Sequence, residues 1–214
     1  MRKIIFIILF SHFCQAQSFK KNLENDVCDC LQKTDSLDQE VFLNCFASML
    51  TKYDAEFEQL IDKNSDVSHY DQGVILGRNL FDDMQVGLVQ NCDKYFFLFE
   101  DLKRIGLQSM KIKYPISQKD SLEKNYEKIK NIDNLLEVAN WHFANGYIET
   151  AEEKYNQILK LDANYLPSKM LLAFLYEEKK KYPEALKLYE EVYLASEKKE
   201  ITLYIEIIKR KMKK

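Results

Sequence analysis

Turn-forming residues are scarce in this chain, whose 214 residues include five glycines and three prolines. So few turn-forming residues favour long helices joined by short loops, because tight turns depend on these two residue types. Lysine, glutamate, leucine, isoleucine and aromatic residues are abundant instead. The composition therefore predicts an all-α fold.

Long apolar runs are also missing beyond the N-terminus. Residues 4–10 form an unbroken apolar run, but it is too short to span a bilayer as a helix, and no later segment is apolar enough. Two basic residues precede the run, and Cys14-Gln15-Ala16 follows it with small residues at signal-peptidase spacing. We expect residues 1–16 to be a signal peptide cleaved before Gln17, which predicts a secreted or periplasmic protein with no membrane span.

The same N-terminal segment has an alternative interpretation as a lipoprotein signal with Cys14 as the acylated residue. That processing needs a leucine-like residue three positions before the cysteine and small residues just before it. Ser11, His12 and Phe13 fit this pattern poorly. Cleavage and release is therefore the preferred interpretation.

The chain has no excess of positive charge. Removal of Arg2 and Lys3 with the signal peptide leaves 29 basic against 34 acidic residues, a net charge of −5. Nucleic-acid binding needs a basic footprint, so we expect none. Five of the residues in 209–214 are basic, but we interpret them as the solvated end of a helix and expect no membrane contact by this tail.

Four cysteines remain after signal removal, and their even number in an oxidising compartment predicts two disulfides. Cys28 and Cys30 point roughly 200° apart on a helix, so each should bond to a different partner. Cys30 shares its helix's apolar face and Cys45 lies in the next apolar stripe, which favours Cys30–Cys45 and Cys28–Cys92. The swapped pairing stays open. No metal site is expected, because a Cys-x-Cys pair on a helix does not converge on one ion.

Residues 17–104 are predicted to form a disulfide-stapled helical bundle. Apolar residues recur at helical spacing in four segments, at about 18–33, 38–62, 67–90 and 92–104. Gly73 and Gly77 lie one turn apart in the third segment and suggest close approach of a neighbouring helix or backbone. The arrangement resembles small secreted bacterial helical domains of uncharacterised role.

Residues 105–117 are the expected linker, because they contain Gly106 and Pro115 and show no clean periodicity. A helix should begin near residue 118, since Ser117 and Asp120 resemble an N-cap signature. The second predicted domain is therefore 118–214.

Within the second domain, similar residues recur at a fixed offset of 34 positions. The pairs are Val138/Leu172, Ala139/Ala173, Ile148/Tyr182, Ala151/Ala185, Tyr155/Tyr189 and Ile158/Val192. A period of 34 is typical of helix-turn-helix repeat arrays. We predict repeats at 132–165 and 166–199, followed by a capping helix at 200–214.

The repeats resemble the tetratricopeptide family. The family's small residue before the turn matches Ala139 and Ala173, its second-helix alanine matches Ala151 and Ala185, and its following aromatic matches Tyr155 and Tyr189. Leu135 and Lys169 replace the aromatic that the family has early in its first helix. The resemblance implies an interaction or scaffolding module without cofactors.

The same resemblance implies a groove along the first helix of each repeat, where a peptide or helix of an unknown partner protein would bind. Carried onto this chain, the groove positions are Asp133, Leu136, Asn140, Phe143, Met170, Phe174 and Glu177. Leu136 lies at the position where carboxylate-binding members of the family have a lysine. We therefore expect a peptide or helix that binds through aliphatic side chains. Trp141, the sole tryptophan, is either an exposed anchor or a packing residue.

Sequence signals for catalysis are absent: there is no phosphate-binding glycine loop, nucleophile elbow or metal-binding helix motif. His69 is expected to be a surface residue near a helix start, and His142 a core or rim residue. We therefore predict no enzyme activity and no catalytic residues. The alternative is that residues 17–104 form a ligand-binding or enzymatic unit, with Tyr95–Phe99 lining its pocket or its core, and that the repeats are a spacer.

Overall fold

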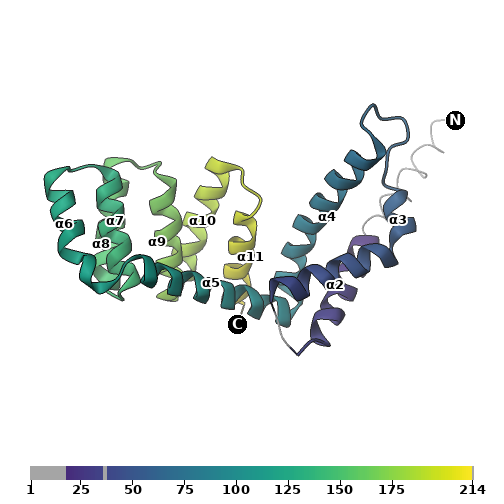
Figure 1. The fold of residues 1–214 in the computed structure, drawn as a ribbon, viewed down its shortest axis with the longest axis horizontal. Helices are drawn as coiled ribbons and strands as arrows, with labels where there is room; N and C mark the ends of the chain where they lie inside the picture. Colours follow the sequence, from purple (N-terminus) through teal and green to yellow (C-terminus); the bar gives the residue numbers. More distant parts are fainter. Residues whose placement is uncertain (1–17, 36–37, 214) are drawn as a thin grey trace. The chain divides into compact units, whose positions relative to one another are not determined.

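The computed structural model describes residues 18–35 and 38–213, and the regular structure in this part is helical throughout, with no strand (Figure 1). The predicted all-α fold is confirmed. The predicted signal peptide, its cleavage before Gln17 and the lipid alternative at Cys14 lie outside the described residues. Among the helices of the described part, none combines the length and apolarity that a membrane span requires.

The chain divides into two compact units, an N-terminal unit (Met1–Leu98) and a C-terminal unit (Phe99–Lys214). The N-terminal unit contains a helical segment at 18–32, α2 (Gln39–Lys52), α3 (Asp54–Glu58), α4 (His69–Asn91) and the start of α5 (Asp93–Lys113). The single helix expected at 38–62 is instead divided at Tyr53. The Tyr53 hydroxyl donates a 2.5 Å hydrogen bond to Asp26, which holds this residue where the chain leaves α2.

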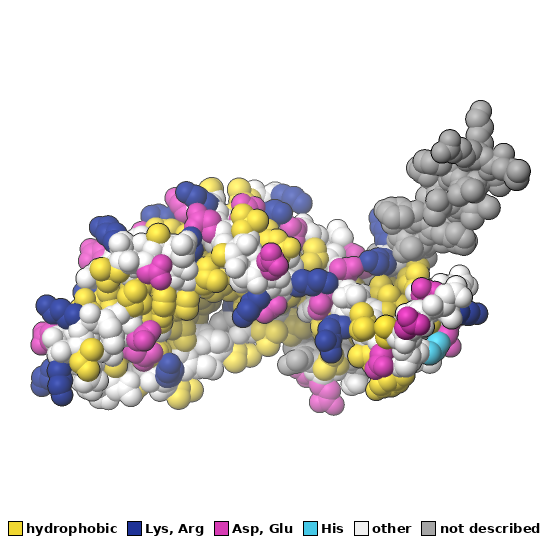
Figure 2. Space-filling model, turned by 90° about the horizontal axis from the view of Figure 1, so that it is seen from above, with side chains coloured by type: hydrophobic (Ala, Val, Ile, Leu, Met, Phe, Trp, Pro, Cys, Tyr) yellow, Lys and Arg dark blue, Asp and Glu magenta, His cyan; other side chains and the backbone are white. Residues whose placement is uncertain are grey.

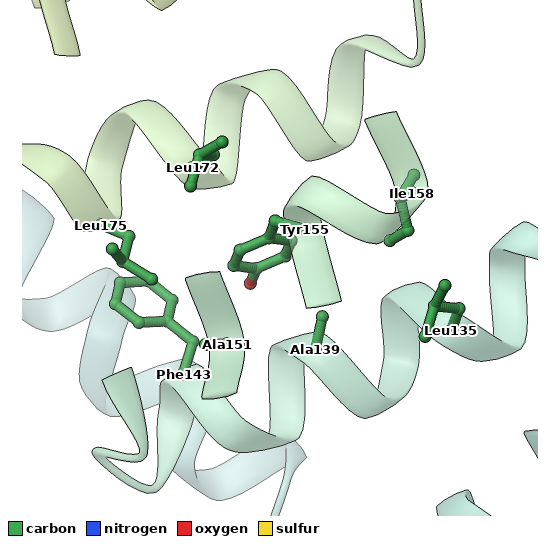
Figure 3. Packing of buried hydrophobic residues seen from close by; sticks show 8 residues of the cluster. All are labelled: Leu135, Ala139, Phe143, Ala151, Tyr155, Ile158, Leu172 and Leu175. Atoms are coloured by element: carbon green, nitrogen blue, oxygen red, sulfur yellow. The ribbon is translucent and has the colours of Figure 1, made fainter. Parts of the chain in front are cut away.

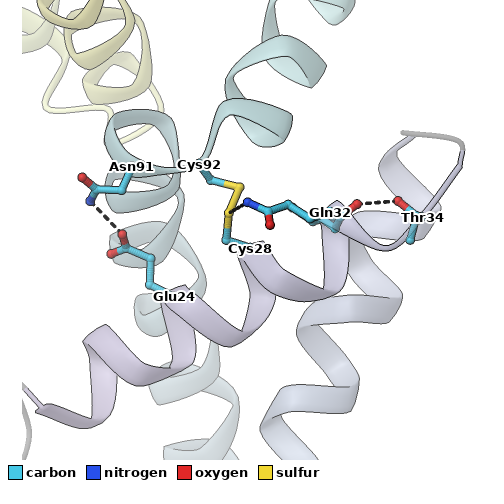
Figure 4. Close-up of a disulfide and its surroundings, with 7 residues drawn as sticks. Glu24, Cys28, Gln32, Thr34, Asn91 and Cys92 are labelled. Atoms are coloured by element: carbon cyan, nitrogen blue, oxygen red, sulfur yellow. Dashed lines mark hydrogen bonds between the residues drawn. A yellow bond between two sulfur atoms is a disulfide. The ribbon is translucent and has the colours of Figure 1, made fainter.

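Two disulfides cross-link the N-terminal unit, and Figure 4 shows the one between Cys28 and Cys92. Cys30 is bonded to Cys45 and Cys28 to Cys92, with Cα atoms 5.8 and 5.7 Å apart, respectively. This is the favoured of the two pairings. Disulfides persist in oxidising compartments, so these bonds indicate an extracytoplasmic environment.

Close helix approach in this unit occurs at a glycine different from the predicted pair. A Cβ at Gly73 or Gly77 would lie 3.9 or 4.0 Å from the Phe57 ring, which is ordinary contact. A Cβ at Gly87 would lie 1.9 Å from a carboxylate oxygen of Glu24. That carboxylate also accepts a 2.8 Å hydrogen bond from Asn91 (Figure 4), so Gly87 lets segment 18–32 lie against α4.

The structure differs from the linker expected at 105–117, because α5 continues without a break to Lys113. Leu107 and Met110 pack against the core of the C-terminal unit, and this burial outweighs the weak helix preference of Gly106. The helix ends before Pro115, which disfavours helical geometry in the residue preceding it. The unit boundary accordingly lies within α5, at residues 98 and 99.

The helices that follow α5 are η1 (Ile116–Gln118), α6 (Lys119–Lys128), α7 (Ile132–Ala144), α8 (Ile148–Leu161), α9 (Leu166–Glu178), α10 (Tyr182–Ser196) and α11 (Ile201–Met212). Among them, the pair α9 and α10 follows the pair α7 and α8 at the predicted step. Both ends of α9 lie one full repeat step after those of α7, and α10 begins one step after α8. The turns repeat as well: Gly146 and Lys180 both have left-handed backbones, with φ of 82° and 59°.

Small and large residues alternate in the core between these helices (Figure 3). Ala139 of α7 and Ala151 of α8 are fully buried, and the Tyr155 ring fills the space beside them. A second cluster contains their counterparts Ala173, Ala185 and Tyr189 together with Ile201, Ile205 and Ile208 of α11. The last helix therefore covers the apolar end of the second helix pair.

Candidate functional site

The candidate site is an open apolar groove within the C-terminal unit, where hydrophobic side chains gather along a hollow (Figure 2). Its volume is about 410 Å³. The lining residues are Phe99, Leu102, Lys103, Gly106 and Met110 of α5, Met170, Leu171 and Phe174 of α9, and Tyr204 of α11. Clefts of this size and apolar character are typical of ligand sites.

Aromatic contacts and a missing side chain shape the groove. The Phe99 ring meets Tyr204 edge-on with centroids 5.6 Å apart, and Phe174 meets the core residue Phe143 at 5.8 Å. At Gly106, apart from the two chain neighbours and the nearby backbone of α5 itself, no atom of the described residues lies within 4 Å of the position that a Cβ would take. The glycine therefore leaves space in the wall that α5 contributes.

A buried charge cluster lies beside the groove, centred on Glu177, whose side chain is 1% exposed. Its carboxylate accepts hydrogen bonds from Lys103, from Lys211 at 2.8 Å and from the Tyr189 hydroxyl at 3.1 Å. Glu100 pairs with the same two lysines at 2.7 and 2.5 Å. Because a buried charge needs such partners, the cluster holds α5, α9 and α11 in a fixed relation.

The pKa values of the cluster follow from its burial and its charges. Burial alone would raise the pKa of the Glu100 carboxyl, but Lys103 and Lys211 bring it below its usual value. Burial raises the pKa of the Tyr189 hydroxyl, and the Glu177 charge raises it further. The Glu100 carboxylate is therefore ionised and the tyrosine is neutral near neutral pH.

The structure places the predicted groove residues in four different environments. Met170 and Phe174 line the groove, and Glu177 is buried in the charge cluster. Asn140 and Phe143 are buried elsewhere, Phe143 in the core of Figure 3 and Asn140 between the hydroxyls of Tyr155 and Tyr114.

The remaining two predicted positions also lie outside the groove. Asp133 is exposed and accepts a 3.2 Å hydrogen bond from Tyr165, and Leu136 packs partly buried against the core.

The reason for this division is the course of α5, which lies across the C-terminal ends of α7, α9 and α11 (Figure 1). Phe99, Gly106 and Met110 of α5 therefore belong to the site, although sequence reasoning assigned them to another domain or to a linker. Phe99, Lys103, Leu107 and Met110 recur at helical spacing across Gly106, and this periodicity was the signal that could have found them.

Trp141 and His142 are packing residues of α7. Trp141 is 2% exposed, donates a 2.9 Å hydrogen bond to the Pro115 carbonyl and stacks on Tyr147. It is therefore a packing residue and not an exposed anchor. His142 is buried next to it, and its Nδ1 atom finds no hydrogen-bond partner among the described residues. Burial lowers the pKa of the His142 imidazole.

The N-terminal unit offers smaller clefts between segment 18–32 and α4. Glu24 and Asn91 line two of them and bond to each other, while Lys20 pairs with Asp83 at 2.6 Å. Tyr95 of the Tyr95–Phe99 stretch is buried in the core. The described residues contain no group of three histidine, cysteine or acidic side chains that could hold a metal ion.

The basic C-terminal segment is largely engaged within its own unit. Lys211 belongs to the charge cluster, and Lys209 pairs with Glu206 at 2.8 Å. Arg210 is buried. The segment is therefore the end of a packed helix.

Comparison of the chain with models of known families, with curated proteins and with solved structures finds no match.

Proposed function

We propose that the chain is an extracytoplasmic protein-binding module whose C-terminal unit is a short tetratricopeptide-like array. The two disulfides support a location outside the cytoplasm. The regular step in helix bounds, and the left-handed turns at Gly146 and Lys180, support the repeat assignment. Arrays of this kind act mainly as binding surfaces, which makes an interaction role the natural one.

The observation that carries the proposal is the open apolar groove between α5, α9 and α11. Exposed apolar concavities are uncommon on proteins that bind nothing. Met110 and Met170 line it, and methionine side chains adapt to irregular partners. Beside it, Lys103 is paired with Glu100 and Glu177, so its charge is already balanced. The fitting ligand is therefore a peptide or helix that inserts uncharged aliphatic or aromatic side chains.

A substitution at Gly106 tests the groove with little disturbance of the core. Gly106→Trp should fill the open space, whereas Gly106→Ala adds one methyl group and serves as the matched control. Phe143→Ala would be a poor test, because Phe143 belongs to the core and its loss would destabilise the fold.

The measurement is recovery of bound proteins by residues 17–214 produced in an oxidising compartment, followed by quantitative mass spectrometry. Wild type and Gly106→Ala should retain the same specific proteins, and Gly106→Trp should recover at least about tenfold less, which corresponds to about 1.4 kcal/mol of binding energy. Equal retention by all three would refute the groove as the binding site. Circular dichroism of each variant checks that the fold is intact.

A further inference from the structure

A second surface of the C-terminal unit combines exposed lysines with exposed isoleucines in residues 111–130. This segment has six lysines and three acidic residues, a net charge of +3. The whole of 99–214 has 22 basic and 19 acidic residues, so the excess positive charge of the unit equals that of this segment. The exposed lysines are Lys111, Lys113, Lys119, Lys124, Lys128 and Lys130.

Isoleucines of the same segment are exposed to water rather than packed. Ile112 is 81% exposed, Ile116 67% and Ile129 55%. Ile112 and Ile116 are four residues apart, hence within about 14 Å of each other, and lie where the chain turns from α5 into α6 (Figure 1). Lys111 and Lys113 flank the first of them directly.

Helix α6 turns its apolar side inward, whereas Lys124 and Lys128 lie on its exposed side. Leu122 packs beside Trp141, and Tyr126 packs against the core of the first helix pair. Lys124 and Lys128 lie one turn apart on the opposite side of the helix. Since α6 is at one end of the unit (Figure 1), this outer side faces away from the other helices.

We propose that residues 111–130 bind an anionic membrane surface. The lysines match the negative charge of lipid phosphates, and the isoleucine side chains are placed to enter the boundary between headgroups and acyl chains. Exposed aliphatic residues interleaved with lysines, as at the turn from α5 into α6, suit the deformable surface of a membrane. The binding is peripheral and independent of the groove.

The test is co-sedimentation of the full mature chain with vesicles of phosphatidylcholine alone and of phosphatidylcholine mixed with phosphatidylglycerol. Wild type should bind the mixed vesicles and not the neutral ones, and added salt should weaken the binding. Lys124→Gln combined with Lys128→Gln should reduce affinity about 30-fold, because each lysine near such a surface contributes about fivefold. Ile112→Ser combined with Ile116→Ser should also reduce it.

The matched control is Leu161→Ser combined with Leu194→Ser, which removes two aliphatic side chains of similar exposure, 64% and 76%, from the same unit. This control should bind like wild type, as should Lys213→Gln at the C-terminal end. Equal binding to neutral vesicles, equal loss in either control, or absence of binding to the mixed vesicles overturns the proposal. Pelleting without vesicles would also overturn it, because the surface would then join copies of the chain.

Discussion

Single residues at the helix turns show how the repeated backbone tolerates different side chains. Tyr147 donates its N–H to the His142 carbonyl at 2.9 Å, and Lys181, at the matching position of the second helix pair, donates to the Tyr176 carbonyl at 2.8 Å. The residue before each donor has a positive φ, but the first is Gly146 and the second is Lys180. Left-handed geometry is unfavourable for residues with a Cβ, so the second turn carries strain that the first does not.

Replacement of the exposed Lys180 by glycine should relieve that strain. Lys180→Gly is expected to raise the free energy of unfolding by about 1 kcal/mol, since the left-handed conformation costs about this much for other residues. The converse change, Gly146→Ala, should lower it by a similar amount or more. Urea unfolding of both variants measures the difference, and a loss of stability in Lys180→Gly would contradict the strain.

The buried His142 makes a pH-dependent contribution to stability. Because burial lowers its pKa in the folded state, the unfolded chain binds this proton more readily, and stability falls as the pH drops below the ordinary value of 6.5. Tyr176 holds the corresponding place in the second helix pair. The melting temperature of His142→Tyr should therefore decrease less than that of wild type when the pH is lowered from neutral to below 6.5. An unchanged profile would show that other groups dominate this range.

At the scale of helices, the charge cluster replaces an apolar core position. Glu177 occupies the place in the second helix pair that Phe143 occupies in the first, and both are buried. Packing alone therefore does not require a carboxylate at this point of α9. The carboxylate instead specifies how the three helices pack, because it forms these hydrogen bonds only when Lys103 of α5 and Lys211 of α11 lie next to it.

Replacement of one member of the charge cluster should lower the free energy of unfolding far more than replacement of all its members. Glu177→Gln is expected to lower the free energy of unfolding by about 3 kcal/mol, because two partly buried lysines lose a charged partner. The combined variant Glu100→Gln, Lys103→Met, Glu177→Phe, Lys211→Met and Tyr189→Phe should recover most of this loss, because no charged member of the cluster is left without a partner. Chemical denaturation compares the two variants, and a combined variant less stable than Glu177→Gln would contradict this account.

Two helical glycines should respond to alanine with opposite signs. Gly106→Ala places a methyl group in open space and should stabilise α5 by up to about 1 kcal/mol. Gly87→Ala drives a methyl group into the Glu24 carboxylate and should destabilise the N-terminal unit. Hydrogen exchange of α5 and α4 reports each effect locally. Similar shifts in both variants would mean that helix preference alone decides.

Helices with strong local signals are predictable from the sequence, whereas those fixed by distant contacts are not. The repeat step depends on residues such as Ala151 and Ala185, which pack in the same way twice, so local pattern and tertiary structure agree. The continuation of α5 through Gly106 depends on burial of Leu107 and Met110 against the core of the C-terminal unit. The helical spacing of the flanking residues agrees with it, but Gly106 and Pro115 are stronger local signals for a linker. For that reason Met170 and Phe174 were predicted in the groove, whereas its α5 wall was not.

At the scale of the whole molecule, both disulfides lie in the N-terminal unit. They close segments of 64 and 15 residues, for which chain entropy gives about 4 and 3 kcal/mol of stabilisation. Reduction should therefore lower the melting temperature of this unit and leave the C-terminal unit unchanged. Hydrogen exchange with and without a phosphine reductant measures the protection of each unit, and equal loss of protection in both would contradict this expectation.

The Cys28–Cys92 disulfide also determines the product of proteolytic cleavage in the N-terminal unit. Cys28 and Cys92 enclose α2, α3 and α4, so any single cut of the backbone between them leaves the two pieces covalently joined. The exposed stretch near Val67 is the kind of site at which such nicking happens. A nicked molecule would keep its full mass on a non-reducing gel and separate only after reduction. One such cut in this region would therefore leave both halves of the protein together.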